Sequence, residues 1–198
     1  MSDRETLDVY ARRAGDYADA FEKPSPDRHL EAYIAALPTG ARVLDLGCGP
    51  GRAAAAMRDA GLLVDASDAS PEMAAIARDR FDLKVRVADF FALDAVDRYD
   101  GIYANFSLLH APKSDMPGHL ARIATALKPG GLFHVGLKTG TGETRDELGR
   151  FYAYYTDDEI TGLLESAGFQ VESRHTGSEA GLDGVEAPFI ILKAKLHD

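Results

Sequence analysis

The first residues whose types and spacing suggest chemistry are an acid and three glycines in VLDLGCGPG, residues 43–51. Asp45 ends an apolar run, and Gly47, Gly49 and Gly51 follow it at alternate positions. Glycines in such a loop let the backbone turn tightly and come close to a ligand. A carboxylate beside the loop would repel a pyrophosphate and attract a positive group. We therefore expect the loop to bind a nucleoside that carries positive charge.

The spacing of these glycines differs from that of dinucleotide-binding loops. Those loops follow the pattern G-x-G-x-x-G, whereas this loop reads G-x-G-x-G and is one residue shorter. Asp68 ends the next apolar segment, where a carboxylate can accept hydrogen bonds from both ribose hydroxyls of a nucleoside. Because NAD also carries ribose, an NAD-dependent oxidoreductase stays open as an alternative, as does a cofactor-binding protein without catalysis. The short loop and Asp45 argue against the oxidoreductase.

The elements that must position these residues alternate between apolar strands and helices. Strands are expected at 41–46, 62–67, 84–88, 99–104, 132–138, 169–175 and 188–196. Helices are expected at 4–21, 27–37, 52–61, 70–81, 115–131 and 156–169. This order predicts an α/β, doubly wound, Rossmann-like fold with a mostly parallel sheet and helices on both faces. Since no helix separates the last two strands, we expect them to pair antiparallel at one edge.

Local signals mark the ends of several helices. Ser70 has the residue type of an N-cap, Pro71 suits the first helical position after it, and Gly61 ends the preceding helix. Thr156 and Glu159 have the spacing of a capping box. These signals place the helix starts directly after the predicted strands, where a ligand would bind.

The N-terminal residues are expected to form a helical cap over the strands. Tyr10, Tyr17 and Phe21 share one face of the expected helix at 4–21, and KPSP at 23–26 ends that helix. An aromatic face of this kind needs a surface to pack against. We expect that surface to be the core of the sheet domain.

The composition describes an ordinary soluble chain, with 45% hydrophobic and 27% charged residues. We expect a single domain over residues 1–198, with the cap at 1–40 and the cofactor-binding core at 41–198. No apolar run approaches the roughly 20 residues that span a bilayer, and the first residues lack the pattern of a signal peptide. Cys48 is the only cysteine, so no internal disulfide can form. We therefore expect a cytoplasmic protein without a membrane partner.

Charge and histidine spacing limit the possible partners. The formal net charge of -10 disfavours a nucleic-acid partner, because neutralising phosphates requires a basic patch. The histidines are spread along the chain without metal-ligand spacing, so we predict no metal. The sequence indicates no oligomeric state.

VLDLGCGPG closely resembles the first motif of the class I S-adenosylmethionine-dependent methyltransferases. The resemblance continues through DASPEM at 68–73, VADFFAL at 87–93, YDGIYANFSLLHAP at 99–112 and LKPGGLFHVGLK at 127–138. It covers most of the chain and points to the branch that acts on small molecules. The family's fold is a seven-stranded sheet whose seventh strand is antiparallel. The resemblance implies that S-adenosyl-L-methionine is the cofactor.

The resemblance also assigns residues to the cofactor. They are Asp45, Gly47, Gly49, Gly51, Asp68, Ala69, Met73, Asp89, Phe90 and Asn105. In the family, the acid at the place of Asp68 holds the ribose, and the acid at the place of Asp89 accepts from the adenine amino group. Phe90 and Met73 would sandwich the adenine or serve as core, and Asn105 would contact the cofactor through its backbone. The alternatives are a helix cap for Asp68 and a solvated turn for Asp89.

The methyl acceptor would lie between the N-terminal helix, the loop at 105–114 and the segment at 138–155. His110 is a candidate general base, or else a structural or substrate-packing histidine. Tyr17 resembles a family tyrosine that closes over the methyl donor, or else packs one helix face. The glycine-containing segment KTGTGETRDELGRFYAYY is expected to form a lid, in which Arg145 or Arg150 meets an anionic group and Tyr152 or Tyr155 packs the acceptor. Alternatively, RDELGR is a solvated turn and FYAYY is core.

These residues predict transfer of a methyl group to O or N of a small or medium-sized molecule. A base is needed only when a hydroxyl or amine must lose a proton, and a carboxylate acceptor needs none. An RNA-modifying methyltransferase acting on tRNA is the alternative, disfavoured by the charge of -10. The identity of the acceptor stays open.

Overall fold

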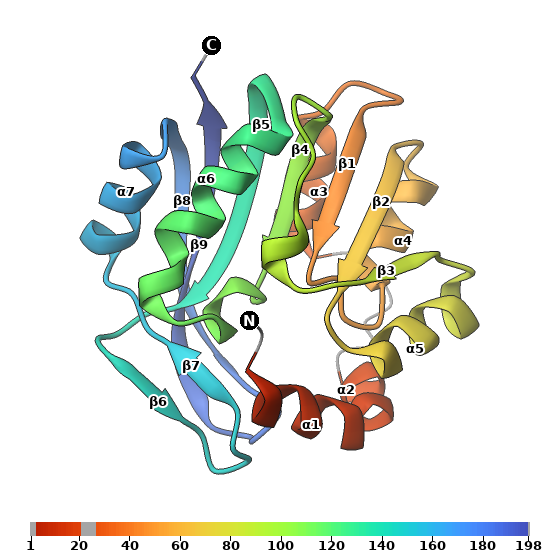
Figure 1. Ribbon diagram of the computed structural model, residues 1–198, viewed down its shortest axis with the longest axis vertical. Helices are drawn as coiled ribbons and strands as arrows, with labels where there is room; N and C mark the ends of the chain where they lie inside the picture. The colour runs from red at the N-terminus through yellow and green to blue at the C-terminus, as the bar shows by residue number, and fades with distance from the viewer. Residues whose placement is uncertain (1–2, 21–26, 198) are drawn as a thin grey trace.

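The computed structural model describes residues 3–20 and 27–197, and the sheet at its centre confirms the predicted α/β fold (Figure 1). Seven strands lie in the order β3-β2-β1-β4-β5-β9-β8. They are β1 (Arg42–Leu46), β2 (Leu63–Asp68), β3 (Val85–Val87), β4 (Tyr99–Asn105), β5 (Leu127–Lys138), β8 (Phe169–Ala180) and β9 (Glu186–Leu196). The first five pair in parallel, whereas β9 runs antiparallel between β5 and β8. The last two strands thus form the expected antiparallel pair, with β8 at the edge.

Helices cover both faces of this sheet, as Figure 1 shows. They are α3 (Arg28–Ala35), α4 (Arg52–Asp59), α5 (Pro71–Phe81), α6 (Met116–Ala126) and α7 (Asp157–Ser166). Leu44 and Leu46 of β1 pack into the cluster that contains the apolar residues of α6 and α7. Val43 packs into the opposite cluster, with residues of α3 and α4. Because side chains alternate along a strand, Asp45 projects to the same side of the sheet as Val43.

The N-terminal segment forms two helices, so the expectation of one continuous helix is wrong. Helix α1 (Arg4–Arg12) and helix α2 (Ala14–Ala20) are separated at Arg13, whose φ of -115° and ψ of 17° leave the helical region. On a continuous helix, residues seven apart lie about 10 Å apart along the axis. The break instead brings the rings of Tyr10 and Tyr17 to 5.5 Å, edge to face. Phe21 and the KPSP segment lie outside the described residues.

The helix before β5 is shorter than expected, because α6 ends at Ala126 and β5 begins at Leu127. The predicted Pro-Gly turn is therefore the irregular first part of a strand. The pairing of β4 with β5 shifts register between Tyr99 and Gly101, and Gly130 adopts a φ of 71°. Pro129 cannot donate a helical hydrogen bond, which stops the helix here.

The predicted helix caps are present. Ser70 Oγ accepts a hydrogen bond from the Met73 N–H at 3.2 Å, and Thr156 Oγ1 accepts from the Glu159 N–H at 3.2 Å. In a capping box the Glu159 carboxylate would accept a hydrogen bond from the Thr156 N–H. Here it accepts from Lys113 Nζ at 2.8 Å instead. Helices α5 and α7 therefore begin where the sequence indicates. None of the described helices is long and apolar enough to cross a membrane.

A separate two-stranded sheet connects β5 to α7. It consists of β6 (Glu143–Arg145) and β7 (Phe151–Ala153), paired antiparallel, and it lies beside α1 in Figure 1. Three short 3-10 helices complete the structure: η1 (Phe90–Ala92), η2 (Leu108–His110) and η3 (Lys113–Asp115). Helix α1, η1, η2 and this β6–β7 hairpin all reach the carboxyl ends of the parallel strands, where the candidate site lies.

Candidate functional site

A cavity of about 480 Å³ lies at the carboxyl ends of β1, β2, β4 and β5. Its volume falls within the range of roughly 300–1,000 Å³ that small-molecule sites occupy. The glycine loop lines one part, and the N-terminal aromatic residues Tyr10 and Tyr17 line another. In a doubly wound sheet, ligands bind at this edge.

Asp45 is the buried acid of this cavity. Its side chain is 2% exposed, and among the described residues Oδ2 has no hydrogen-bond partner. Burial, followed by the nearby Asp68, raises the pKa of Asp45 to about 7. A buried carboxylate without a full set of partners is unfavourable unless a cation or donor completes it. Asp45 therefore suits a ligand with a positive group.

The glycines of the loop have different neighbours. Gly47 and Gly49 both adopt left-handed backbone conformations, with φ of 77° and 53°. A Cβ at Gly47 would lie only 2.4 Å from the Cβ of Ser107, so this glycine is required by packing. A Cβ at Gly49 would meet nothing closer than the Tyr17 ring at 3.9 Å. The backbone at Gly49 therefore faces open space that a ligand can occupy.

Asp68 holds the glycine loop against the start of α5. Its Oδ2 accepts from the Gly49 N–H at 2.8 Å, and its Oδ1 accepts from the Ser70 N–H at 2.8 Å. Burial raises the pKa of this carboxyl. Each oxygen keeps further acceptor capacity, so these bonds leave room for ligand hydroxyls. Asp68 thus combines the helix-cap contact with a position in the cavity lining.

Five further residues assigned to the cofactor are divided between two hollows. Ala69, Met73, Phe90 and Asn105 line the main cavity. Asp89 instead borders a second hollow, and its Oδ1 accepts from the Phe91 N–H at 3.0 Å. Its side chain therefore caps η1 in the described structure.

Two residues of the main cavity were missed by the sequence analysis. Phe91 and His119 both line it, and their rings pack 4.4 Å apart. His119 Nδ1 is buried and has no hydrogen-bond partner among residues 3–20 and 27–197. Only the packing of α6 against η1 reveals this histidine, because no spacing pattern connects it to the glycine loop.

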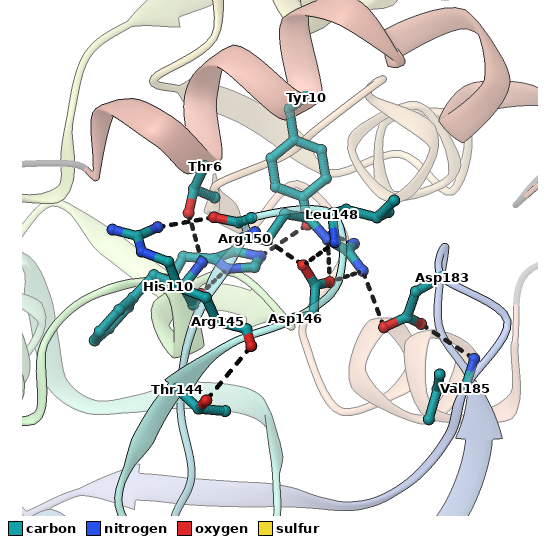
Figure 2. A network of polar contacts seen from close by, with 12 residues as sticks. Thr6, Tyr10, His110, Thr144, Arg145, Asp146, Leu148, Arg150, Asp183 and Val185 are labelled. Atoms are coloured by element: carbon teal, nitrogen blue, oxygen red, sulfur yellow. Dashed lines mark hydrogen bonds and ion pairs between the residues drawn. The ribbon is translucent and has the colours of Figure 1, made fainter.

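His110 is connected through both ring nitrogens (Figure 2). Its Nδ1 lies 2.7 Å from the carbonyl oxygen of Phe151, and its Nε2 lies 2.8 Å from Tyr10 Oη. A carbonyl only accepts, so Nδ1 carries the proton and Nε2 accepts from the tyrosine hydroxyl. Burial lowers the pKa of His110 to about 4, so the ring is neutral at pH 7. In this state the histidine positions Tyr10.

Arg150 is the buried cation of the same network (Figure 2). It is 2% exposed, and its Nη2 lies 2.6 Å from Asp146 Oδ2 and 3.8 Å from Asp183 Oδ2. Its Nη1 donates to Tyr10 Oη at 3.4 Å, and its guanidinium stands 5.2 Å from the centre of the Tyr152 ring. The charge of Arg150 is thus balanced within the protein.

The predicted lid segment divides into a part that lines the cavity and a part that does not. Tyr152 is 3% exposed and packs 4.8 Å from the His110 ring. Arg145 projects from β6 to the start of α1, where its Nη1 and Nη2 donate to the two oxygens of Asp3 at 2.9 and 2.8 Å. The Phe151 N–H also donates to Thr6 Oγ1 at 2.8 Å. The hairpin is therefore fastened to α1.

Comparison with known proteins agrees with this geometry. A family model described as "Methyltransferase domain" matches residues 43–131. The Ubiquinone biosynthesis O-methyltransferase of Xanthomonas axonopodis pv. citri is 34% identical over 139 residues, which are 63% of this chain and 57% of that protein. The Trans-aconitate 2-methyltransferase of Variovorax paradoxus is 34% identical over 136 residues, 67% of this chain and 51% of that protein. The chain thus spans little more than half the length of these curated relatives.

A solved structure extends the similarity to nearly the whole chain. The 1,6-didemethyltoxoflavin-N1-methyltransferase of Burkholderia thailandensis, solved with 1,6-didemethyltoxoflavin and S-adenosylhomocysteine, has a TM-score of 0.78 and 25% identity. The match covers 98% of this chain and 88% of that chain. This chain belongs to the class I S-adenosylmethionine-dependent methyltransferases. Its cofactor is S-adenosyl-L-methionine.

The cavity of this methyltransferase fits that cofactor. S-adenosylmethionine carries an ammonium and a sulfonium, and the buried Asp45 has an oxygen that no other described residue contacts by a hydrogen bond. The open space beside Gly49 and the ring of Phe90 lie in the same cavity, next to Asp68. The donor set therefore matches a positively charged nucleoside, as the carboxylate beside the glycine loop predicts. Among the described residues, no cluster of His, Cys, Asp and Glu could hold a metal ion.

Proposed function

We propose that this protein transfers a methyl group from S-adenosylmethionine to O or N of a small or medium-sized molecule. The observation that carries the proposal is Oδ2 of buried Asp45, which accepts no hydrogen bond from residues 3–20 and 27–197, beside the open backbone of Gly49. When bound, S-adenosylmethionine supplies a methyl group activated by the sulfonium. The solved relative with a bound heteroaromatic acceptor supports a small planar substrate.

The chain's own residues would contribute orientation and exclusion of water. Asp45 would bind the cofactor's ammonium, and Asp68 would accept hydrogen bonds from its ribose. Tyr17, Tyr10 and Tyr152 line the cavity and would hold the acceptor in line with the methyl group. Fixed geometry of this kind accounts for much of the rate enhancement when two reactants must meet.

We propose a positioning role for His110 instead of a role as general base. Its Nε2 already accepts from Tyr10, and its pKa of about 4 makes it a weak base at neutral pH. An acceptor that is ionised in solution, or that gives its proton to solvent, would need no base from the protein. Arg145, which binds Asp3, would hold the hairpin closed without touching the acceptor.

The same proposal includes the partners and the location. A cavity of about 480 Å³ suits a small acceptor, and the net charge of -10 disfavours RNA. Cys48 is a buried free thiol, and burial raises its pKa, so it is no nucleophile. These features support a cytoplasmic protein that needs neither a membrane nor a nucleic acid.

The test has two steps. Calorimetry should show binding of S-adenosylhomocysteine and no binding of NAD. Methyl transfer from radiolabelled S-adenosylmethionine should then appear with at least one member of a panel of phenols, carboxylic acids and nitrogen heterocycles, and be absent with bulk tRNA. Tighter binding of NAD would contradict the proposal, and transfer to tRNA alone would favour the RNA-modifying alternative.

A further inference from the structure

A continuous wall of rings connects the cofactor end of the cavity to one lysine. Tyr17, beside the glycine loop, contacts Tyr10 with ring centres 5.5 Å apart. Tyr10 contacts His110 at 5.3 Å, and His110 contacts Tyr152 at 4.8 Å. The Nζ of Lys138 stands 4.4 Å from the centre of the Tyr152 ring. An acceptor lying along this wall would have one end near the methyl group and the other near Lys138.

Lys138 is a cation of this region that forms no close ion pair with the described residues. It lines the cavity at the end of β5, and the described part of the chain provides no hydrogen bond or ion pair to its Nζ. Burial lowers its pKa, which shows that the ammonium is partly removed from water. Three N–H donors thus remain available to a ligand.

Two of the three acids around Lys138 already have partners. Asp146 accepts from Arg150 Nε at 2.8 Å and from two backbone N–H groups. Asp183 lies near Arg150 and accepts from a backbone N–H at 3.2 Å. Glu179 also lines the cavity but is exposed to water, on strand β8. All three acids act on Lys138 from a distance and favour its charged form, but among the described residues none forms an ion pair with its Nζ. The ammonium can therefore still donate to a ligand anion.

Apolar side chains line the cavity wall next to Lys138. Phe189 pairs with Lys138 across the β5–β9 ladder and lines the cavity. Its ring packs edge to face with Phe106 at 5.7 Å, and Ile191 lines the same region. A flat ring can pack on such surfaces, whereas a highly hydrated ligand would not replace its water contacts.

We propose that Lys138 anchors an acidic group of the methyl acceptor, which makes the acceptor a flat organic acid. The anchored acid stays at Lys138, and a second heteroatom of the same molecule faces the methyl group. This inference rests on the proposed function, because it locates the acceptor relative to the cofactor. Lys138 takes the anion-binding role for which the sequence analysis considered Arg145 and Arg150.

The experiment measures binding of matched acid and amide pairs to the whole protein saturated with S-adenosylhomocysteine. The probes are benzoate with benzamide and 2-naphthoate with 2-naphthamide, followed by calorimetry or saturation-transfer NMR near neutral pH. The acids should bind roughly tenfold or more tightly than the amides, because a charge-assisted hydrogen bond distinguishes them. Lys138→Met should remove this preference, and Lys138→Arg should retain it.

A matched control comes from the other end of the same strand. Lys128 pairs with Asp100 at 2.7 Å and lies outside the cavity, so Lys128→Met should keep the preference for acids. Equal binding of acids and amides, or binding of neither, would overturn the inference while S-adenosylhomocysteine binding upholds the proposed function. A preference that survives in a folded Lys138→Met protein would also overturn it. Failure of S-adenosylhomocysteine to bind in the first titration would reject both proposals.

Discussion

The two ends of the cavity are built in different ways. At the cofactor end, Asp45, Gly49 and Asp68 come from neighbouring parallel strands and the loops directly after them. Backbone N–H groups and short side chains make the contacts there. At the acceptor end, α1, η2, the loop between β6 and β7 and the tip of the β8–β9 hairpin each contribute a side chain to one polar network (Figure 2).

This difference predicts which changes separate the two functions of the cavity. The cofactor end depends on backbone conformation, so substitutions there should affect folding or cofactor affinity. The acceptor end depends on side chains that bridge distant segments. Substitutions there should affect the acceptor and the closure of the hairpin while the cofactor binds as before.

The largest expected effect distinguishes two glycines of one loop. Gly47→Ala should destabilise the ligand-free protein by about 2 to 4 kcal/mol, since the added Cβ meets Ser107 at 2.4 Å in a left-handed conformation. Gly49→Ala has no such clash and should cost only the backbone strain, roughly 1 kcal/mol, while weakening cofactor binding. Urea unfolding and calorimetry measure the two effects. Equal destabilisation by both variants would contradict the division between a packing glycine and a ligand-facing one.

Asp68→Ala should weaken S-adenosylhomocysteine binding next most strongly. Loss of a charge-assisted hydrogen bond worth about 1.5 to 3 kcal/mol corresponds to roughly 10- to 150-fold in affinity. Part of the loss would come from the loop, because Asp68 also binds the Gly49 N–H. Calorimetry on a folded variant provides the measurement, and Tyr152→Phe at the acceptor end serves as its control. Unchanged affinity for Asp68→Ala would place the ribose elsewhere.

Asp45 should make both the stability of the ligand-free protein and its cofactor affinity depend on pH. With a folded pKa of about 7 against an ordinary 3.8, Asp45 binds a proton more readily when the protein is folded. Its burial therefore costs no stability below about pH 4, and the cost grows as pH rises to about 7. Asp45→Asn should raise the unfolding temperature of the ligand-free protein at pH 8.

The same substitution should weaken binding of S-adenosylhomocysteine, whose ammonium needs the ionised carboxylate. Wild-type affinity should rise as pH increases through about 7, and the affinity of Asp45→Asn should stay flat. Titration calorimetry at several pH values measures both curves. Parallel curves for the two proteins would show that Asp45 does not meet the ammonium.

His110 should show no titration near neutral pH. Burial holds its pKa near 4, below the ordinary 6.5, so the folded protein resists protonation of this ring. Its contribution to stability is present above about pH 6.5 and is lost as pH falls toward 4. Its NMR ring signals should stay constant from pH 8 to about 5. A midpoint near 7 would restore the general-base role and remove the contrast between the two ends.

The smallest effect is expected for Arg145→Ala. The ion pair with Asp3 is solvent-exposed, so the unfolding temperature should change little. Amide hydrogen exchange in β6 and β7 should become faster, because the hairpin loses its attachment to α1. Cofactor affinity should stay the same. Exchange as slow as in the central strands, in both the variant and the wild type, would show that the hairpin is fixed by core packing alone.

Much of the cofactor end follows from residues that are close in the chain. The loop after β1 combines an apolar strand, Asp45 and the glycines within a few residues, and Ser70 caps α5 directly after Asp68. Strand period, turn residues and capping preferences are local properties, so they can be identified without coordinates. The mostly parallel sheet, the starts of α5 and α7 and a positively charged ligand were predicted at this level, and the resemblance to the methyltransferases named the cofactor.

The acceptor end depended on contacts between distant segments. The break at Arg13, the pairing of Tyr10 with His110 and the attachment of Arg145 to Asp3 join residues that no spacing pattern relates. Whether a histidine is a base or a fixed partner depends on its burial and its neighbours, which tertiary packing sets. For the same reason only the structure distinguished Lys138, which forms no close ion pair in the described part of the chain, from Arg150, which forms one with Asp146.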